Sequence, residues 1–285
     1  MAELLKGKEV VAAMKERLLQ QVNKLEEAGV HPQMAIVRCG ARPDDLSYEA
    51  GAIKRFSGLG IGLRVVELPQ DIDQPSFIQE LENLNADDRI HGVLVFRPLP
   101  SQLDEGVIKY VLSPEKDMDA MTPDNLAKVF AADPSGYPPC TPEAVMELLS
   151  HFGVELSGKR VTIVGRSMVV GKPLSMMMLA KNATVTICHT RTQDLPARTR
   201  EADILVACAG KAKMITRDHV SPGQVVIDVG INVDENGKLC GDVDQAAVEN
   251  VVARLTPVPG GVGTVTTSCL AQHVVRAAMK QAGLN

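Results

Sequence analysis

The sequence contains no tryptophan, and only three tyrosines and five phenylalanines among its 285 residues. Aromatic side chains are the usual platforms on which nucleic-acid bases stack, so their scarcity disfavours that kind of binding. The sequence also has no block of lysines and arginines, and its formal net charge is -5. These absences exclude a typical nucleic-acid-binding protein.

Long apolar runs are missing as well. No segment reaches the roughly 20 consecutive apolar residues that a membrane-spanning helix needs. Residues 1–19 (MAELLKGKEVVAAMKERLL) lack the apolar core of a signal peptide. We therefore expect a cytoplasmic protein that binds a small molecule, and neither a membrane nor nucleic acid.

The cysteines contain no Cys-x-x-Cys pair, and the six histidines show no metal-ligand spacing. Most of the cysteines lie in apolar, strand-like segments, which is typical of buried thiols rather than of zinc ligands or disulfides. The sequence thus predicts no structural metal. The six cysteines are Cys39, Cys140, Cys188, Cys208, Cys240 and Cys269.

Strand-like and helix-like segments alternate along the chain. Helical spacing of apolar residues marks 9–28 and 103–113, whereas 34–39 (MAIVRC) and 91–100 (HGVLVFRPLP) are typical of buried strands. This alternation predicts an α/β fold with parallel sheets and helical crossovers. Because single cores usually stop growing near ~250 residues, we expect two domains, with hinge material in the proline-rich segment 114–142.

Residues 158–175 (GKRVTIVGRSMVVGKPLS) carry the strongest local signal. A short apolar strand at 160–164 leads into a glycine turn at 165–167, and a second glycine at 171 opens a helix. Such a turn presents backbone N–H groups and a helix N-terminus to a phosphate, which predicts a nucleotide cofactor. The spacing differs from Gly-x-Gly-x-x-Gly, and strand–glycine–helix turns without a ligand are also common.

Seven short segments, in order over essentially the whole chain, carry a further pattern. They are Lys116-Asp117-Met118-Asp119, Pro139-Cys140-Thr141-Pro142, Val164-Gly165-Arg166-Ser167 to Val170-Gly171, Ala183-Thr184-Val185-Thr186 to His189, Asp228-Val229-Gly230-Ile231-Asn232, Gly241-Asp242-Val243 and Thr256-Pro257-Val258-Pro259-Gly260-Gly261-Val262-Gly263. Together they resemble the methylenetetrahydrofolate dehydrogenase/cyclohydrolase family of the bifunctional FolD type. That family oxidises 5,10-methylenetetrahydrofolate with NAD(P)⁺ and then hydrolyses the methenyl product to 10-formyltetrahydrofolate, in one-carbon metabolism.

The resemblance also implies an architecture. It predicts a folate-binding domain over residues 1–148, joined by a C-terminal helix over 273–285. A Rossmann-like NAD(P)-binding domain is expected over 149–272, with the active site in the cleft between the two domains. Members of the family are typically homodimers, so a homodimer is expected here.

The cofactor residues of the family are all matched. By this resemblance, Gly165, Arg166 and Ser167 hold the cofactor phosphates, Gly171 completes their loop, and Ile231 contacts the nicotinamide half through its backbone.

Thr190 and Arg191 follow the second strand of the same domain, where the adenosine ribose is read. A carboxylate there would favour the 2′-hydroxyl of NAD. The cations Arg191 and Arg166 instead favour a 2′-phosphate, hence NADP over NAD. The alternative is that Arg191 is a solvated loop arginine.

On the substrate side, the resemblance assigns Tyr48 to stacking on the folate and Asp119 to hydrogen bonding with the pterin. Pro259, Gly260 and Gly261 form the loop between substrate and cofactor. Taken alone, Tyr48 could equally be a half-buried helix tyrosine, and Asp119 a turn or helix-cap carboxylate.

Two positions depart from the family together. Ala52 stands where the family has its catalytic lysine, and Phe96 replaces the glutamine that partners that lysine. Lys54 lies two residues further along the helix, a rotation of about 200°, and so should point elsewhere. Arg97 replaces a leucine, and its shifted position disfavours it as a substitute cation. Smaller departures are Ala120, Thr264-Val265-Thr266 and His273.

The two reactions of the family make different demands. Hydride transfer needs positioning and exclusion of water, whereas hydrolysis needs proton transfer by the lysine–glutamine pair. We therefore expect an NADP-dependent dehydrogenase with weak or no cyclohydrolase activity. Two alternatives remain: a dehydrogenase for a different pterin or another small substrate, and a catalytically silent paralogue that binds NADP or a partner.

Overall fold

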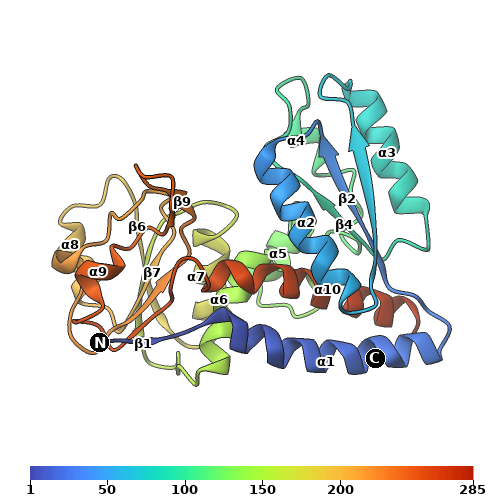
Figure 1. The fold of residues 1–285 in the computed structure, drawn as a ribbon. Helices are drawn as coiled ribbons and strands as arrows, with labels where there is room; N and C mark the ends of the chain where they lie inside the picture. Colours follow the sequence, from blue (N-terminus) through green and yellow to red (C-terminus); the bar gives the residue numbers. More distant parts are fainter. Residues whose placement is uncertain (285) are drawn as a thin grey trace. The chain divides into compact units, whose positions relative to one another are not determined.

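The computed structural model describes residues 1–284, which divide into two compact α/β units (Figure 1). The first, called here the six-stranded unit, comprises residues 1–12 and 141–266. The second, the three-stranded unit, comprises residues 13–140 and 267–284. The expectation of a two-part α/β fold with parallel sheets is confirmed.

The sheet of the six-stranded unit is parallel throughout, in the order β1-β11-β8-β7-β5-β6. Its strands are β1 (Glu3–Leu4), β5 (Arg160–Val164), β6 (Thr184–Cys188), β7 (Ile204–Ala207), β8 (Val225–Asp228) and β11 (Arg254–Leu255). The interior strands β5 and β7 are almost wholly buried, as expected when both faces of a parallel sheet are covered. The edge strand β6 alternates between more and less exposed residues.

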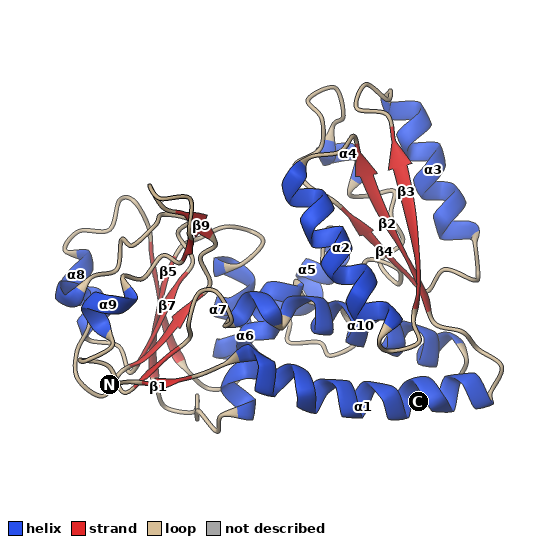
Figure 2. Cartoon of the chain, viewed as in Figure 1, coloured by secondary structure: helices blue, strands red, loops and turns tan. Residues whose placement is uncertain are grey.

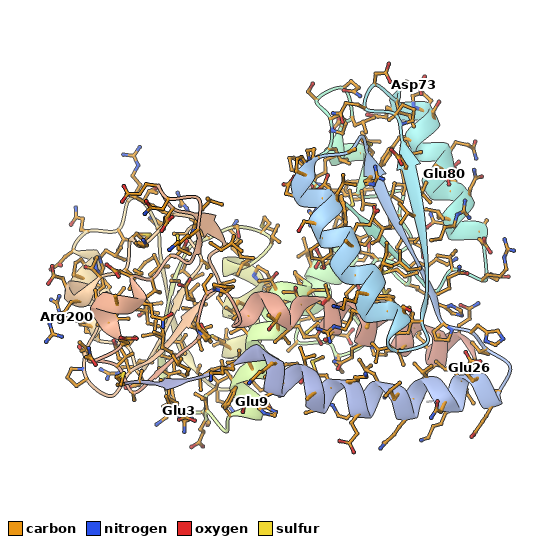
Figure 3. The ribbon with its side chains drawn as sticks, in the orientation of Figure 1. Glu3, Glu9, Glu26, Asp73, Glu80 and Arg200 are labelled. Atoms are coloured by element: carbon orange, nitrogen blue, oxygen red, sulfur yellow. The ribbon has the colours of Figure 1, made fainter. Side chains whose placement is uncertain are left out.

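Helices and one hairpin complete this unit. They are α6 (Cys140–His151), α7 (Gly171–Leu179), α8 (Leu195–Arg200), η1 (Arg217–His219), α9 (Gln245–Val248), η2 (Val262–Thr264) and the antiparallel pair β9 (Asn232–Val233) and β10 (Leu239–Cys240). Figure 3 labels Arg200 at the end of α8, where its guanidinium donates to the Asp218 carbonyl.

The unit boundaries lie at residues 12/13, 140/141 and 266/267, whereas the sequence placed them at 148/149 and 272/273. Residues 1–12 join the six-stranded unit because β1 pairs with β11, and the Glu3 carboxylate lies 2.9 Å from Arg254 Nε. The end of α6 is held in the same unit, since Arg254 Nη1 donates to the Phe152 carbonyl.

The three-stranded unit has the parallel order β3-β2-β4, with β2 (Gln33–Cys39) in the centre. Figure 2 shows these strands with α2 and α3 beside them. Asp73 caps the start of α3 by accepting the Ser76 N–H, and Figure 3 shows it there. The remaining elements are α1 (Gly7–Glu27), which begins in the other unit, α2 (Pro43–Ser57), β3 (Gly62–Leu68), α3 (Gln74–Ala86), β4 (Gly92–Val95), α4 (Glu105–Ile108), α5 (Pro123–Phe130) and α10 (Thr266–Gln281).

Two expected elements are shorter than the sequence predicted. The strand expected over 91–100 ends at Val95, because Pro98 and Pro100 lack the N–H groups that a ladder requires. The helix expected over 103–113 has one α-helical stretch, Glu105–Ile108, followed by i→i−3 turns such as Tyr110 N–H to the Val107 carbonyl. The spacing of apolar residues over 103–113 arises because these side chains are buried against the sheet, and not because the whole segment is a regular helix.

Candidate active site

The glycine turn at residue 165 lies where the strand order of the six-stranded sheet reverses. β5 is followed in sequence by β6 on one side, and the chain then crosses to β7 on the other side. In open α/β sheets, ligands bind beyond the carboxyl ends of the strands at such a switch point. Topology therefore selects the turn after β5, which the sequence had selected from its glycines.

Gly165 and Gly171 allow this turn to close. Gly165 has a backbone φ of 140°, a value that residues with a side chain rarely adopt. A Cβ there would lie closer than 3.0 Å to the Cys208 carbonyl oxygen. A Cβ on Gly171 would similarly meet the Gly165 carbonyl oxygen. Arg166 and Ser167 are exposed between the two glycines, and Ser167 Oγ accepts the Val170 N–H at 3.1 Å. Arg166 and Ser167 are thus accessible at this turn, whereas the N–H groups of Val170 and Lys172 at the start of α7 are hydrogen-bonded to Ser167.

The segment after β6 carries the residues expected to read the ribose. His189 Nδ1 accepts the Arg191 N–H at 3.1 Å, and the His189 N–H donates to Thr192 Oγ1 at 2.9 Å. This turn leaves Thr190 and Arg191 exposed. Asp194, the nearest carboxylate in sequence, caps α8 through the Ala197 N–H.

Two buried carboxylates, which sequence reasoning left without a role, organise the neighbouring loops. Asp242 accepts the N–H groups of Ala209, Gly210 and Lys211 at 2.6–2.9 Å, and also Asn232 Nδ2 at 2.9 Å. Its side chain therefore fixes the loop after β7 to the loop after β8.

Asp228, at the end of β8, fixes a second set of backbone groups. Its carboxylate accepts the N–H groups of Gly230, Asp242 and Val243 at 2.9–3.0 Å. The adjacent Ile231 is 69% exposed. The sequence signal for both carboxylates was present in the Asp-Val-Gly and Gly-Asp-Val motifs, but only the fold shows which loops they hold.

Burial raises the pKa of Asp228 to about 6, against the three N–H donors that lower it, and the nearby charge of Asp242 adds to the rise. The folded chain thus binds this proton more tightly than the unfolded chain, so the contribution of Asp228 to stability is complete below about pH 4 and is lost as pH rises through about 6. At about 1.4 kcal/mol per tenfold change in proton affinity, the difference is about 3 kcal/mol.

We therefore expect the destabilisation caused by Asp228→Asn to be larger at pH 4 than at pH 7. Urea unfolding of both proteins at the two pH values measures it. Asp203→Asn is the control with opposite sign, because hydrogen bonds from Arg160 lower the pKa of Asp203. An Asp228→Asn penalty that grows toward pH 7 would contradict the prediction.

The loop of Pro259, Gly260 and Gly261 is held by the N-terminal segment of the same unit. The Gly7 N–H donates to the Gly260 carbonyl at 2.9 Å, and Thr264 Oγ1 donates to the Gly261 carbonyl at 2.7 Å. A Cβ on Gly7 would lie closer than 3.0 Å to Thr264 Oγ1 and the Gly261 oxygen. Residue 7 must therefore be glycine for α1 to begin against this loop.

In the three-stranded unit, α2 presents Tyr48 and Ala52 one turn apart. Ala52 is fully buried, whereas Lys54 is exposed, as the rotation between them requires. Tyr48 is half-buried, and its ring meets the ring of Phe96 edge-on, with 5.6 Å between centroids. The ring of Tyr48 is thus in apolar contact with the ring of Phe96.

Asp119 lies in a turn that a neighbouring carboxylate builds. Asp117 is buried and accepts the N–H groups of Met121 and Thr122, the Thr122 hydroxyl and Asn125 Nδ2. This set of bonds fixes the backbone on both sides of Asp119.

The Asp119 carboxylate has two neighbours of its own. Oδ1 accepts the Cys140 N–H at 2.7 Å, and Oδ2 lies 3.9 Å from Arg97 Nη2. Burial raises the pKa of Asp119, while the Cys140 N–H and the charge of Arg97 oppose that rise. The sequence disfavoured Arg97 as a substitute for the missing lysine, and its guanidinium lies beside Asp119.

His273, which the sequence resemblance marked as a departure from the family pattern, is buried behind this turn. Its Nδ1 lies 2.8 Å from the Met118 carbonyl and 3.8 Å from Cys140 Sγ, and its ring packs at a tilt against Tyr137. The histidine thus contacts the backbone that precedes Asp119.

Within residues 1–284, no group of three or more His, Cys, Asp or Glu side chains is arranged to hold a metal ion. Over the same residues, none of the six cysteines forms a disulfide. None of the helices described is both long and apolar enough to cross a membrane.

Comparison with known sequences connects these features. Residues 5–119 match the catalytic domain of the tetrahydrofolate dehydrogenase/cyclohydrolase family, and residues 139–282 match its NAD(P)-binding domain. The bifunctional protein FolD of Clostridioides difficile is 54% identical over 279 residues, covering 98% of this chain and 97% of that protein. The bifunctional protein FolD of Carboxydothermus hydrogenoformans is also 54% identical, with 97% of each chain covered.

Solved structures agree with the sequence matches. The FolD methylenetetrahydrofolate dehydrogenase/cyclohydrolase of Campylobacter jejuni superposes with a TM-score of 0.96 at 36% identity, covering 98% of this chain and 99% of that one. The Trypanosoma brucei enzyme, solved with NADP cofactor and an inhibitor, superposes with a TM-score of 0.92 at 33% identity over 98% of both chains. The chain therefore belongs to the tetrahydrofolate dehydrogenase/cyclohydrolase family.

Proposed function

We propose that this chain oxidises 5,10-methylenetetrahydrofolate to the methenyl compound with NADP⁺, and that its cyclohydrolase activity is weak or absent. One observation carries the proposal. The glycine turn lies at the sheet's switch point, whereas Ala52 of α2, which the sequence resemblance assigns to the family's lysine position, is a fully buried alanine. The chain thus keeps the turn that would bind the nucleotide but has no side chain at residue 52 that could transfer a proton in hydrolysis.

The residues around Gly165 fit a dinucleotide. A Cβ at Gly165 or Gly171 would collide with the chain's own backbone, so glycine at both positions lets the turn close tightly. A glycine turn between a strand and a helix is the kind of site that holds a dinucleotide diphosphate. When bound, NADP supplies the hydride-accepting nicotinamide. Arg166 and Arg191, both exposed cations, suit the 2′-phosphate that distinguishes NADP from NAD. The bound cofactor in the Trypanosoma brucei relative supports the same choice.

Oxidation requires the protein to position the substrate, and it requires no general acid or base. Hydride leaves the methylene carbon as the lone pair of an adjacent nitrogen forms the cationic methenyl product. The contribution of the chain is to hold the pterin, which we assign to Tyr48 and Asp119, and to keep water away. The edge-on contact of Phe96 with Tyr48 is compatible with that work, because it restrains the Tyr48 ring.

Hydrolysis asks for more. Water must be positioned, a proton must leave it, and another must reach the departing nitrogen. Neither Ala52 nor Phe96 can transfer a proton, and the exposed Lys54 lies on another side of α2. Loss of one acid–base group typically slows such a step by ~10²–10⁴-fold.

A paired assay on the purified protein tests the proposal. One half follows reduction of NADP⁺ or NAD⁺ with 5,10-methylenetetrahydrofolate; the other follows decay of the methenyl compound above its spontaneous rate. We expect oxidation, with NADP⁺ preferred, and little catalysed hydrolysis. Robust hydrolysis would refute the division of activities. Absence of both would favour a different small substrate, or a silent paralogue that binds NADP or a partner.

A further inference from the structure

Arg97 lies between two carboxylates of the three-stranded unit. Its Nη1 is 3.3 Å from Glu105 Oε1, and its Nη2 is 3.9 Å from Asp119 Oδ2. Its side chain is 24% exposed, less than a freely solvated arginine. The guanidinium thus joins the start of α4 to the turn that carries Asp119.

The backbone of Arg97 is held as well. Arg42 Nη2 donates to the Arg97 carbonyl at 3.1 Å, and the same guanidinium forms two hydrogen bonds to Asp45, at 2.8 and 2.9 Å. The backbone of Arg97 is therefore connected through Arg42 to the first turn of α2, and these hydrogen bonds restrain the place from which the Arg97 side chain extends.

The two oxygens of Asp119 have different surroundings. The short hydrogen bond from the Cys140 N–H fixes Oδ1. The 3.9 Å separation between Oδ2 and Arg97 is an ion pair but is too long for a hydrogen bond. Oδ2 thus feels the positive charge and retains its capacity to accept a hydrogen bond from a ligand.

We propose that Arg97 is a positioning residue that keeps the Asp119 carboxylate ionised and oriented to accept the paired N–H groups of a pterin ring. This inference rests on the proposed function. A pterin presents a ring N–H beside an exocyclic amine, and only an ionised carboxylate can accept from both. A protonated carboxyl would direct its own hydrogen at one of these donors.

The charged and titratable neighbours of Asp119 decide the direction of the effect. Burial and, to a smaller extent, the negative charge of Asp117 raise the pKa of Asp119, whereas the Cys140 N–H, the charge of Arg97 and the Cys140 thiol lower it. His273 Nδ1 lies 2.8 Å from the carbonyl oxygen of Met118, the residue that precedes Asp119. Removing the charge of Arg97 removes one of the opposing influences, so the pKa of Asp119 should rise further.

Arg97→Gln removes the charge and keeps a side chain that can donate hydrogen bonds, while Arg97→Lys keeps the charge. Arg89→Gln is the control, because Arg89 is exposed in the same unit and pairs with Asp87. For each protein, the pH dependence of kcat/KM for oxidation is measured. In parallel, the ¹³C signal of the Asp119 carboxyl is titrated, and Asp119→Asn identifies it by its absence.

In Arg97→Gln, we expect the acid limb of kcat/KM and the Asp119 titration to move up together, by about one pH unit. Arg97→Lys should move them less, and Arg89→Gln should leave both unchanged. At high pH, Arg97→Gln should approach the kcat/KM of the unaltered protein. Loss by the same factor at every pH, with an unmoved carboxyl signal, would overturn the inference and leave Arg97 a structural role.

The carboxyl titration needs no turnover, so it separates this inference from the proposed function. If the unaltered protein fails to oxidise the folate substrate but the Asp119 signal shifts in Arg97→Gln, the pairing stands and the proposed substrate is wrong. If oxidation is observed but the signal stays where it was, the proposed function stands and the role of Arg97 is refuted.

Discussion

The double substitution Ala52→Lys, Phe96→Gln is expected to raise catalysed hydrolysis of the methenyl compound by about 10²–10⁴-fold, the usual contribution of an acid–base group. Rates of oxidation should change far less, because hydride transfer depends on positioning. The measurement is the decay of the methenyl compound above its spontaneous rate, beside the oxidation assay on the same preparations.

The geometry of α2 explains why both residues must change. Residue 52 lies one turn from Tyr48, whose ring already contacts Phe96. A lysine at residue 52 would enter a fully buried position, where burial lowers the pKa of an amine and makes it a better base near neutral pH. The same burial penalises an unpartnered ammonium, so a glutamine at residue 96 is needed to accept its hydrogen bond.

Matched controls separate the site from the mere addition of an amine. Ile53→Lys adds a lysine to the next residue of α2, on a position that is 43% exposed, and should leave hydrolysis unchanged. Ala52→Lys alone should give a smaller gain than the double variant, at a cost in stability. Wild-type hydrolysis that is already fast, and that the double variant fails to improve, would show that another group of this chain transfers the proton.

The regular elements of the fold follow from the sequence because their signals are local. The apolar spacing over 9–28 predicts α1, which spans Gly7–Glu27, and the buried run 34–39 predicts β2, which spans Gln33–Cys39. Gly165 was also identifiable, since a glycine between strand and helix is a local feature. Patterns that repeat within a few residues need no knowledge of distant contacts.

The contacts of the site could not be found in this way. Asp228 and Asp242 are distant in sequence from the loop at 209–211 that Asp242 binds. Arg97 reaches Glu105 and Asp119 only because the loops beyond β4 converge. Such contacts depend on which strand ends are neighbours, and a single sequence does not specify them.

The consequence of having alanine at residue 120, where the sequence resemblance predicts glycine, can be seen only in the structure. The φ of 50° at Ala120 is in the left-handed region that glycine favours. The hydrogen bonds of Asp117 to Met121 and Thr122 hold the turn in place, so alanine is tolerated there at a cost of about 1 kcal/mol. The turn that carries Asp119 is therefore maintained with alanine at residue 120.

Gly165→Ala is expected to weaken binding of NADP by at least about 100-fold, equivalent to about 2.7 kcal/mol. The added Cβ would lie closer than 3.0 Å to both the carbonyl oxygen and Sγ of Cys208. The Cys208 N–H is bonded to the Val164 carbonyl, so the backbone of β7 cannot move away without losing a bond of the sheet. The turn must shift instead, and its N–H groups leave the place where a phosphate would bind.

Gly158→Ala is the matched control for this prediction. Gly158 precedes the same strand and also has positive φ, 73°, but a Cβ there would have no neighbour within 4 Å. Both variants should lose stability from backbone strain, measured by thermal unfolding, yet only Gly165→Ala should lose affinity in a calorimetric titration with NADP. Equal loss of affinity in both would mean that general destabilisation, and not the position of the turn, weakens binding. Unchanged affinity in Gly165→Ala would mean that the phosphates bind away from the switch point of the sheet.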